Sequence, residues 1–305
     1  MEHNTDLFGN PITQEKRSMS DYFGVPPFSI LNTVEGDWQA RKRKWNSLIG
    51  DQGQAREGVL GDSDGMLGKI SNGTSILDAC LVEVLLKWFT EEGYTTFDPF
   101  AGDTVFGFVS GYLKRPFEGI ELRPEQAEFN QIQCDREELP CKYYNDSSEH
   151  MDKYIQDNSK DFVFSCPPYA DLEVYSDLEE DLSTMSHEDF FAMYRQILQN
   201  TYKKLKNNRF AVVVTSEVRD KKTGEYIRLV PKTIDIMVDA GYIFYNDIIL
   251  VNSVGTLPLR VGKQMNSGRK VGRRHQNVLV FYKGDTKQIK DNFGEIIPKN
   301  QHYNK

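Results

Sequence analysis

YTTFDPFAGDTVFGFVSGYLKRPFEGIE, residues 94–121, is the stretch that decides the fold. Residues 94–98 have the composition and length of a short strand, and 104–113 have helical apolar spacing. Residues 117–121 (FEGIE) are then expected to form another short strand. A strand, a tight turn, a helix and another strand in this order predict two parallel strands joined by a helical crossover.

The same alternation continues on both sides of this unit. Further strands are expected at 141–144, 161–165, 209–215, 242–251 and 277–282, and helices at 75–89, 124–135, 147–155, 186–205 and 226–240. No helix is expected between the last two strands, so we expect them to pair antiparallel. The fold class is therefore α/β, with a mostly parallel sheet, an antiparallel last strand and helices on both faces.

The chain divides into three parts by pattern. Residues 1–70 lack sustained periodicity and form an N-terminal extension, residues 71–284 form the regular domain, and residues 285–305 form a tail. The extension holds one helical candidate, 37–49, with Trp38, Trp45 and several cations. Its cations either form a solvated face on a helix held by the tryptophans or contact a nucleic-acid backbone.

Composition bounds the function classes. With 305 residues and a net charge of -8, the chain is not a purely electrostatic nucleic-acid binder, although a local basic surface remains open. No apolar run reaches about 18 residues, and the start lacks a signal-peptide layout, so no membrane contact is expected. The four cysteines show no CxxC pair, which predicts reduced thiols, no metal and a cytoplasmic location.

Three acidic residues end three successive expected strands. They are Asp98, Glu121 and Asp146. Each alone is more often a helix cap, but at the carboxyl edge of one sheet such side chains suit ribose hydroxyls and a purine amino group. Together they predict a nucleoside ligand, without excluding a dinucleotide.

The segment CPPY follows the strand at 161–165. Pro167 and Pro168 fix a stiff, extended exit from the sheet and leave their carbonyls as acceptors. Tyr169 follows on this platform and suits stacking on a planar base. Taken alone, the segment is also typical of a rigid loop with a buried thiol, Cys166.

These two segments resemble motifs of the DNA amino-methyltransferases. FDPFAGDT at 97–104 resembles their cofactor motif, DPFxGxGT, and CPPY resembles their catalytic motif of Asp, Asn or Ser before Pro-Pro and an aromatic residue. The order and spacing match, and RHQNVLVFYKG at 274–284 resembles the family's last strand. The resemblance covers residues 71–284 and extends to methylase-like proteins of bacteriophages.

The resemblance implies a Rossmann-like class I methyltransferase that uses S-adenosylmethionine. Glu121 would bind the ribose of this cofactor and Asp146 its adenine amino group, while Tyr169 would stack on a base turned out of the duplex. The full implied cofactor set is Ser75, Asp98, Phe100, Ala101, Gly102, Asp103, Thr104, Glu121, Asp146 and Ser147.

The sequence departs from the family pattern at two positions. Asp103 stands where a small residue is common, and Cys166 replaces the usual acceptor. A thiol is a weak acceptor, so the Pro167 carbonyl would have to hold the target amino group. Alternatively, Cys166 is the nucleophile of cytosine C5 methylation, with Glu217 as the carboxylate. Because the C5 motif places its cysteine after a proline rather than before two, amino methylation is favoured.

Residues 252–284 carry a run of cations and no acidic residue. Most of them lie in the expected loop 252–276, namely Arg260, Lys263, Arg269, Lys270, Arg273 and Arg274. In an acidic chain this asymmetry favours a phosphate-binding surface for double-stranded DNA over a solvated loop.

The sequence thus predicts a site-specific DNA methyltransferase of the N4-cytosine or N6-adenine type, with a homodimer left open. A C5 enzyme and a catalytically inactive methylase-like DNA-binding module are the alternatives. A dinucleotide-dependent oxidoreductase is disfavoured because the turn lacks GxGxxG.

Overall fold

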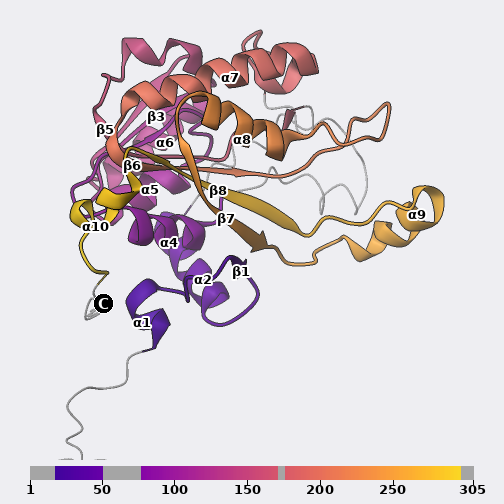
Figure 1. The fold of residues 1–305 in the computed structure, drawn as a ribbon, viewed down its shortest axis with the longest axis horizontal. Coiled ribbons are helices and arrows are strands. Elements are labelled where there is room, and N and C mark those ends of the chain that lie inside the picture. The colour runs from indigo at the N-terminus through magenta and orange to yellow at the C-terminus, as the bar shows by residue number, and fades with distance from the viewer. Residues whose placement is uncertain (1–17, 51–76, 171–175, 297–305) are drawn as a thin grey trace, which may run out of the picture.

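A single eight-stranded sheet forms the centre of the molecule in the computed structural model, which describes residues 18–50, 77–170 and 176–296 (Figure 1). The strands are β1 (Ile30–Asn32), β2 (Thr96–Asp98), β3 (Phe117–Glu121), β4 (Cys141–Asn145), β5 (Lys160–Ser165), β6 (Leu205–Thr215), β7 (Ile243–Val251) and β8 (His275–Lys283). Their order is β1-β7-β8-β6-β5-β2-β3-β4. Only β8 runs antiparallel to its neighbours, β6 and β7. This confirms the expected α/β fold class, with a mostly parallel sheet and an antiparallel last strand.

Helices cover both faces of this sheet. They are α1 (Met19–Phe23), α2 (Trp38–Ile49), α4 (Ala79–Phe89), α5 (Val105–Tyr112), α6 (Pro124–Arg136), α7 (His187–Lys204), α8 (Leu229–Asp239), α9 (Pro258–Gly268) and α10 (Ile289–Asn292), with short 3-10 helices at Ser148–Lys153, Leu182–Thr184 and Thr286–Gln288. Alternate residues of β5 point to opposite faces, as a strand requires. Phe162 and Phe164 pack with α2, α4 and α5, whereas Val163 packs with α7 and α8.

The N-terminal residues 18–50 pack against the regular part of the chain. β1 pairs in parallel with β7, and the buried Trp38 and Trp45 belong to the same core as α4. The Trp38 indole donates to Asp78 at 3.2 Å, and Lys42 makes an ion pair with Asp78 at 3.0 Å. At least part of the cationic face of α2 is therefore neutralised inside the protein.

The connection between β7 and β8 contains a helix that the sequence did not predict. We expected a loop at 252–276, but α9 occupies its middle and projects from the body (Figure 1). α9 has no buried residue, so no apolar stripe facing a core was available to signal it. An α-helix was also expected at 147–155, but the structure has a short 3-10 helix there, Ser148–Lys153.

No helix within the described ranges has the length and hydropathy needed to cross a bilayer. The same residues contain no cluster of three or more His, Cys, Asp or Glu side chains that could hold a metal ion.

A candidate active site at the switch point of the sheet

A cleft of about 810 Å³ opens at the carboxyl ends of the central strands. Strand order reverses between β2, from which the chain moves outward to β3 and β4, and β5, to which it returns. Ligands of open α/β sheets bind at such a switch point. The cleft is lined by the turn after β2, the end of β3, the CPPY loop after β5, the end of β6 and the root of the β7–β8 connection.

The turn after β2 is organised by Asp98. Its Oδ1 accepts hydrogen bonds from the Phe100 backbone N–H at 2.8 Å and from Ser165 Oγ at 2.6 Å. Burial raises the pKa of the Asp98 carboxyl to about 7, against the effect of these bonds. Gly102 adopts a positive φ of 53°, which lets the backbone turn beside the cleft. Phe100, Ala101 and Gly102 all line the cleft.

Asp103 and Thr104 support this turn. Asp103 also lines the cleft, and it accepts from the backbone N–H groups of Leu77 at 3.0 Å and Val105 at 2.9 Å. It therefore joins the start of α5 to the segment that precedes α4, which gives an acidic side chain a structural role at this position. Thr104 is fully buried and donates to Asn130 at 2.7 Å, behind the cleft wall. Ser75 lies outside the described residues.

Glu121 reaches the cleft from the end of β3 as half of a buried ion pair. Its Oε1 accepts from the Arg123 backbone N–H at 3.1 Å and from Arg123 Nε at 2.9 Å. Arg123 lines the cleft too. The sequence reasoning missed Arg123, although an arginine two positions after a strand-ending acid was visible.

Asp146 does not line the cleft. Burial opposes its ionisation, but hydrogen bonds from His150 at 2.8 Å, Tyr154 at 2.7 Å and Lys153 at 3.0 Å lower the pKa of Asp146 well below its usual range. At this strand end Ser147 and the neighbouring Ser148 face the cleft instead.

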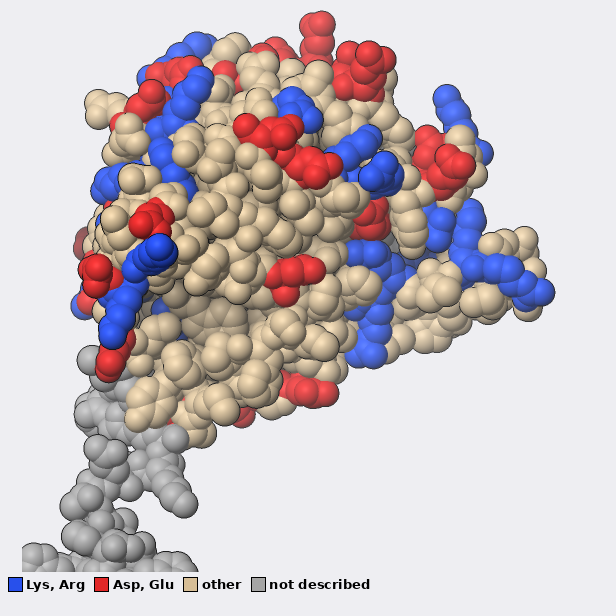
Figure 2. Space-filling view, viewed as in Figure 1, with Lys and Arg blue, Asp and Glu red and all other residues tan. Residues whose placement is uncertain are grey.

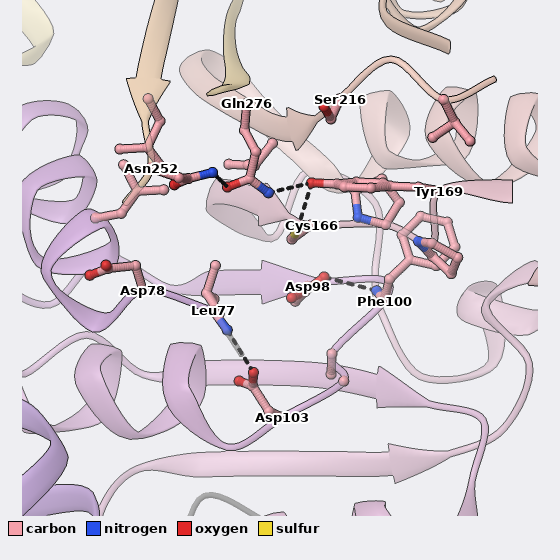
Figure 3. A pocket seen from close by; sticks show the side chains of 18 of the residues that line it. Leu77, Asp78, Asp98, Phe100, Asp103, Cys166, Tyr169, Ser216, Asn252 and Gln276 are labelled. Atoms are coloured by element: carbon pink, nitrogen blue, oxygen red, sulfur yellow. Dashed lines mark hydrogen bonds between the residues drawn. The ribbon is translucent and has the colours of Figure 1, made fainter. Parts of the chain in front are cut away.

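The CPPY loop follows β5, which pairs directly with β2. All four of its residues, Cys166, Pro167, Pro168 and Tyr169, line the cleft. The Tyr169 hydroxyl lies 3.4 Å from Cys166 Sγ and accepts from Gln276 Nε2 at 2.7 Å (Figure 3). Asn252 Nδ2 in turn donates to Gln276 Oε1 at 3.4 Å. Sequence reasoning missed both amides, since nothing local marks a partner 107 positions away.

Glu217 lines the same cleft from the end of β6. Its Oε1 accepts from the Val230 backbone N–H at 3.2 Å. Its Oε2 is shielded from solvent and finds no hydrogen-bond partner within the part of the chain that the structure describes. A thiol and a carboxylate therefore share one cleft.

The cations of the β7–β8 connection fall into two groups. We call this connection, residues 252–274, the arm, and its two ends beside β7 and β8 the root of the arm. Figure 2 shows Lys and Arg side chains along the arm and at its root. At the root, Arg273 donates to Ser216 at 2.8 Å and to Asn277 at 2.6 Å, and Arg274 donates to the Asn252 carbonyl at 2.9 Å. The side chains of the other four make no hydrogen bond or ion pair with another described residue: Arg260, Lys263, Arg269 and Lys270.

No family model matches this sequence, and no curated protein sequence matches it. Among solved structures, it resembles TrmN from Thermus thermophilus at 14% identity and a TM-score of 0.47, over 72% of this chain and 52% of that one. It thus spans about half the length of TrmN. A putative RNA methyltransferase, PH1948 from Pyrococcus horikoshii, is 12% identical with a TM-score of 0.46, over 81% and 100%. The [4+2]-cyclase SpnF is 12% identical with a TM-score of 0.47, over 68% and 82%. Similarity at this level identifies neither a cofactor nor a reaction.

Proposed function

We propose that this protein is an S-adenosylmethionine-dependent DNA methyltransferase that modifies an exocyclic amino group of a flipped base. The observation that carries the proposal is the meeting of two motifs, residues 98–103 and 166–169, at neighbouring strands of one cleft. Each motif alone is also typical of a turn or loop with a purely structural role. Their convergence at the switch point of the sheet favours a shared active site.

The residues around the turn suit a nucleoside cofactor. Glu121 offers a carboxylate for ribose hydroxyls, and the backbone at Ala101 and Gly102 can approach a ligand closely. Ser147, rather than Asp146, is the polar side chain available at the next strand end. When bound, S-adenosylmethionine supplies an electrophilic methyl group, and the protein supplies its orientation.

The CPPY loop suits the target base. Tyr169 provides a stacking face, and the Pro167 carbonyl is a better acceptor for an amino hydrogen than the Cys166 thiol. An acceptor at this position would hold the amino group so that its lone pair points toward the cofactor side of the cleft.

The basic arm suits the DNA backbone. Four of its six cationic side chains are not engaged by described residues, and Arg260 also lines the cleft. Phosphate contacts at this rim would bring a duplex to the mouth of the base pocket.

Cytosine C5 methylation is the second candidate. It is favoured by one observation, the presence of Glu217 in the cleft that holds Cys166. C5 chemistry needs a thiolate nucleophile and a carboxylate at the pyrimidine edge.

Nucleoside mass spectrometry of DNA from cells expressing the protein tests these proposals. N4-methylcytosine or N6-methyladenine that is lost with Tyr169→Ala is the expected result. 5-Methylcytosine would support the second candidate. No new nucleoside, with cofactor binding intact by calorimetry, would support the inactive DNA-binding module.

A further inference from the structure

We infer that Gln276, backed by Asn252, is a positioning residue that holds the Tyr169 ring for base stacking and ties it to the root of the DNA-binding arm. This inference rests on the proposed function. It concerns two residues that the sequence motifs do not include.

The direction of the hydrogen bonds shows that Gln276 holds the Tyr169 hydroxyl. Gln276 Nε2 can only donate, so the Tyr169 hydroxyl accepts this bond and its own hydrogen points elsewhere. Cys166 Sγ, at 3.4 Å, lies where it can accept that hydrogen. Donation therefore runs from Asn252 through Gln276 to the Tyr169 hydroxyl, which also contacts Cys166 Sγ (Figure 3).

The two amides lie at the root of the arm. Asn252 directly follows β7 and Gln276 is the second residue of β8, so they stand where the arm leaves and rejoins the sheet. The Asn252 N–H donates to the Arg274 carbonyl at 3.0 Å, and Arg274 Nε donates to the Asn252 carbonyl at 2.9 Å. A shift at the root of the arm would therefore act on the two amides that hold Tyr169.

The backbone beside Tyr169 is strained. Ala170 is buried and has a φ of 51°, a left-handed conformation that a residue with a Cβ seldom adopts. Such strain persists only where the surroundings hold the backbone in place, and it is often found at functional positions. The strained backbone of Ala170 directly follows Tyr169, and the bond from Gln276 holds the Tyr169 hydroxyl, so a base would meet a ring that is already ordered.

A double-mutant cycle tests the inference. Gln276→Leu and Tyr169→Phe each remove one end of the bond, and each should lower kcat on DNA roughly 2- to 13-fold, the effect of one lost hydrogen bond. The double variant should be no slower than the slower single variant. Cofactor affinity by calorimetry should stay unchanged, because neither Gln276 nor Tyr169 is among the residues expected to hold the cofactor. Gln196→Leu, on the solvent face of α7, is the matched control and should retain full activity.

A second measurement needs no substrate. In protein labelled with ¹³C at the tyrosine ζ carbon, the Tyr169 signal should shift in Gln276→Leu and in Asn252→Leu but not in Gln196→Leu. If the wild-type protein does not methylate DNA, the proposed function fails, and this signal alone decides whether the amides hold Tyr169. An unmoved signal, or a moved signal with unchanged kcat in an active enzyme, would overturn the inference.

Discussion

At the scale of single residues, Asp98 shows how the site is held together. It is buried, and it joins the turn after β2 to Ser165 at the end of β5. The two motifs of the cleft are thus connected by one carboxyl group. Burial, together with the neighbouring charges of Asp103 and Glu121, raises the pKa of this group to about 7.

We predict that Asp98 makes the protein less stable as the pH rises. Below about pH 4 the carboxyl is protonated in both folded and unfolded chains. The contribution of this group to the free energy of unfolding is then fully present. Between about pH 4 and 7 the unfolded chain loses this proton first, so the free energy of unfolding should fall by about 1.4 kcal/mol per pH unit from this group. Asp98→Asn should remove that slope in urea titrations from pH 5 to 8.

The control is Asp235→Asn, an exposed position on α8. It should leave the pH dependence as in the wild type. If the free energy of unfolding changes with pH in the same way in the wild type and in Asp98→Asn, then Asp98 has the same pKa in the folded and unfolded chains.

A second prediction at this scale concerns Cys166. In amino methylation the thiol only lines the pocket, and Cys166→Ser supplies an acceptor that the related motif commonly has. Methyl transfer should then persist or rise, with the methyl group on an exocyclic nitrogen. In C5 methylation a serine hydroxyl is too weak a nucleophile, and turnover should nearly vanish.

DNA containing 5-fluorocytosine separates the two outcomes further. We expect no covalent complex with the wild-type protein on denaturing gels. A trapped complex, together with a folded, cofactor-binding but inactive Cys166→Ser, would decide for C5 chemistry.

At the scale of elements, α9 and its flanks form an arm on which Arg260, Lys263, Arg269 and Lys270 are exposed. If Arg269 and Lys270 bind phosphates, neutralising both to Gln should reduce the slope of log affinity against log salt by about 0.9 for each phosphate interaction that is removed. Fluorescence anisotropy of labelled duplexes over a salt series measures this slope.

Lys287 and Lys290 provide the matched pair for this experiment. Both are exposed, Lys287 on the 3-10 helix Thr286–Gln288 and Lys290 on α10, and Figure 1 shows α10 on the side of the molecule opposite α9. Their neutralisation should leave the slope unchanged. Equal effects of the two pairs would indicate general charge attraction, and the cations of the arm would then be a solvated surface rather than a phosphate-binding one.

At the scale of the whole molecule, residues 18–50 share a core with the sheet. Trp38→Ala removes a buried indole and its bond to Asp78, and should lower the free energy of unfolding by about 3–5 kcal/mol. Because α2 packs on α4, urea transitions followed by circular dichroism and by tryptophan fluorescence should coincide at the lower midpoint.

Trp38→Phe keeps most of the buried volume and should cost clearly less. An unchanged circular dichroism transition in Trp38→Ala would show instead that residues 18–50 are an appendage that folds apart from the sheet.

The sequence by itself determined the sheet and the meeting of its motifs. Period-2 and helical spacing specify strands and helices locally, and alternation of the two forces the carboxyl ends of β2, β3 and β5 to one edge. That was enough to expect residues 98–103 and 166–169 near one another. The run of cations at 252–276 could likewise be assigned to one segment from its composition.

Only the tertiary structure decided which way individual side chains face. Asp146 turns to His150 and Tyr154 rather than to the cleft, and Arg273 is held by Ser216 rather than left for DNA. Gln276 meets Tyr169 across 107 residues of chain. Such contacts depend on how separate elements pack, and no local period or propensity encodes the partner of a polar side chain at a strand end.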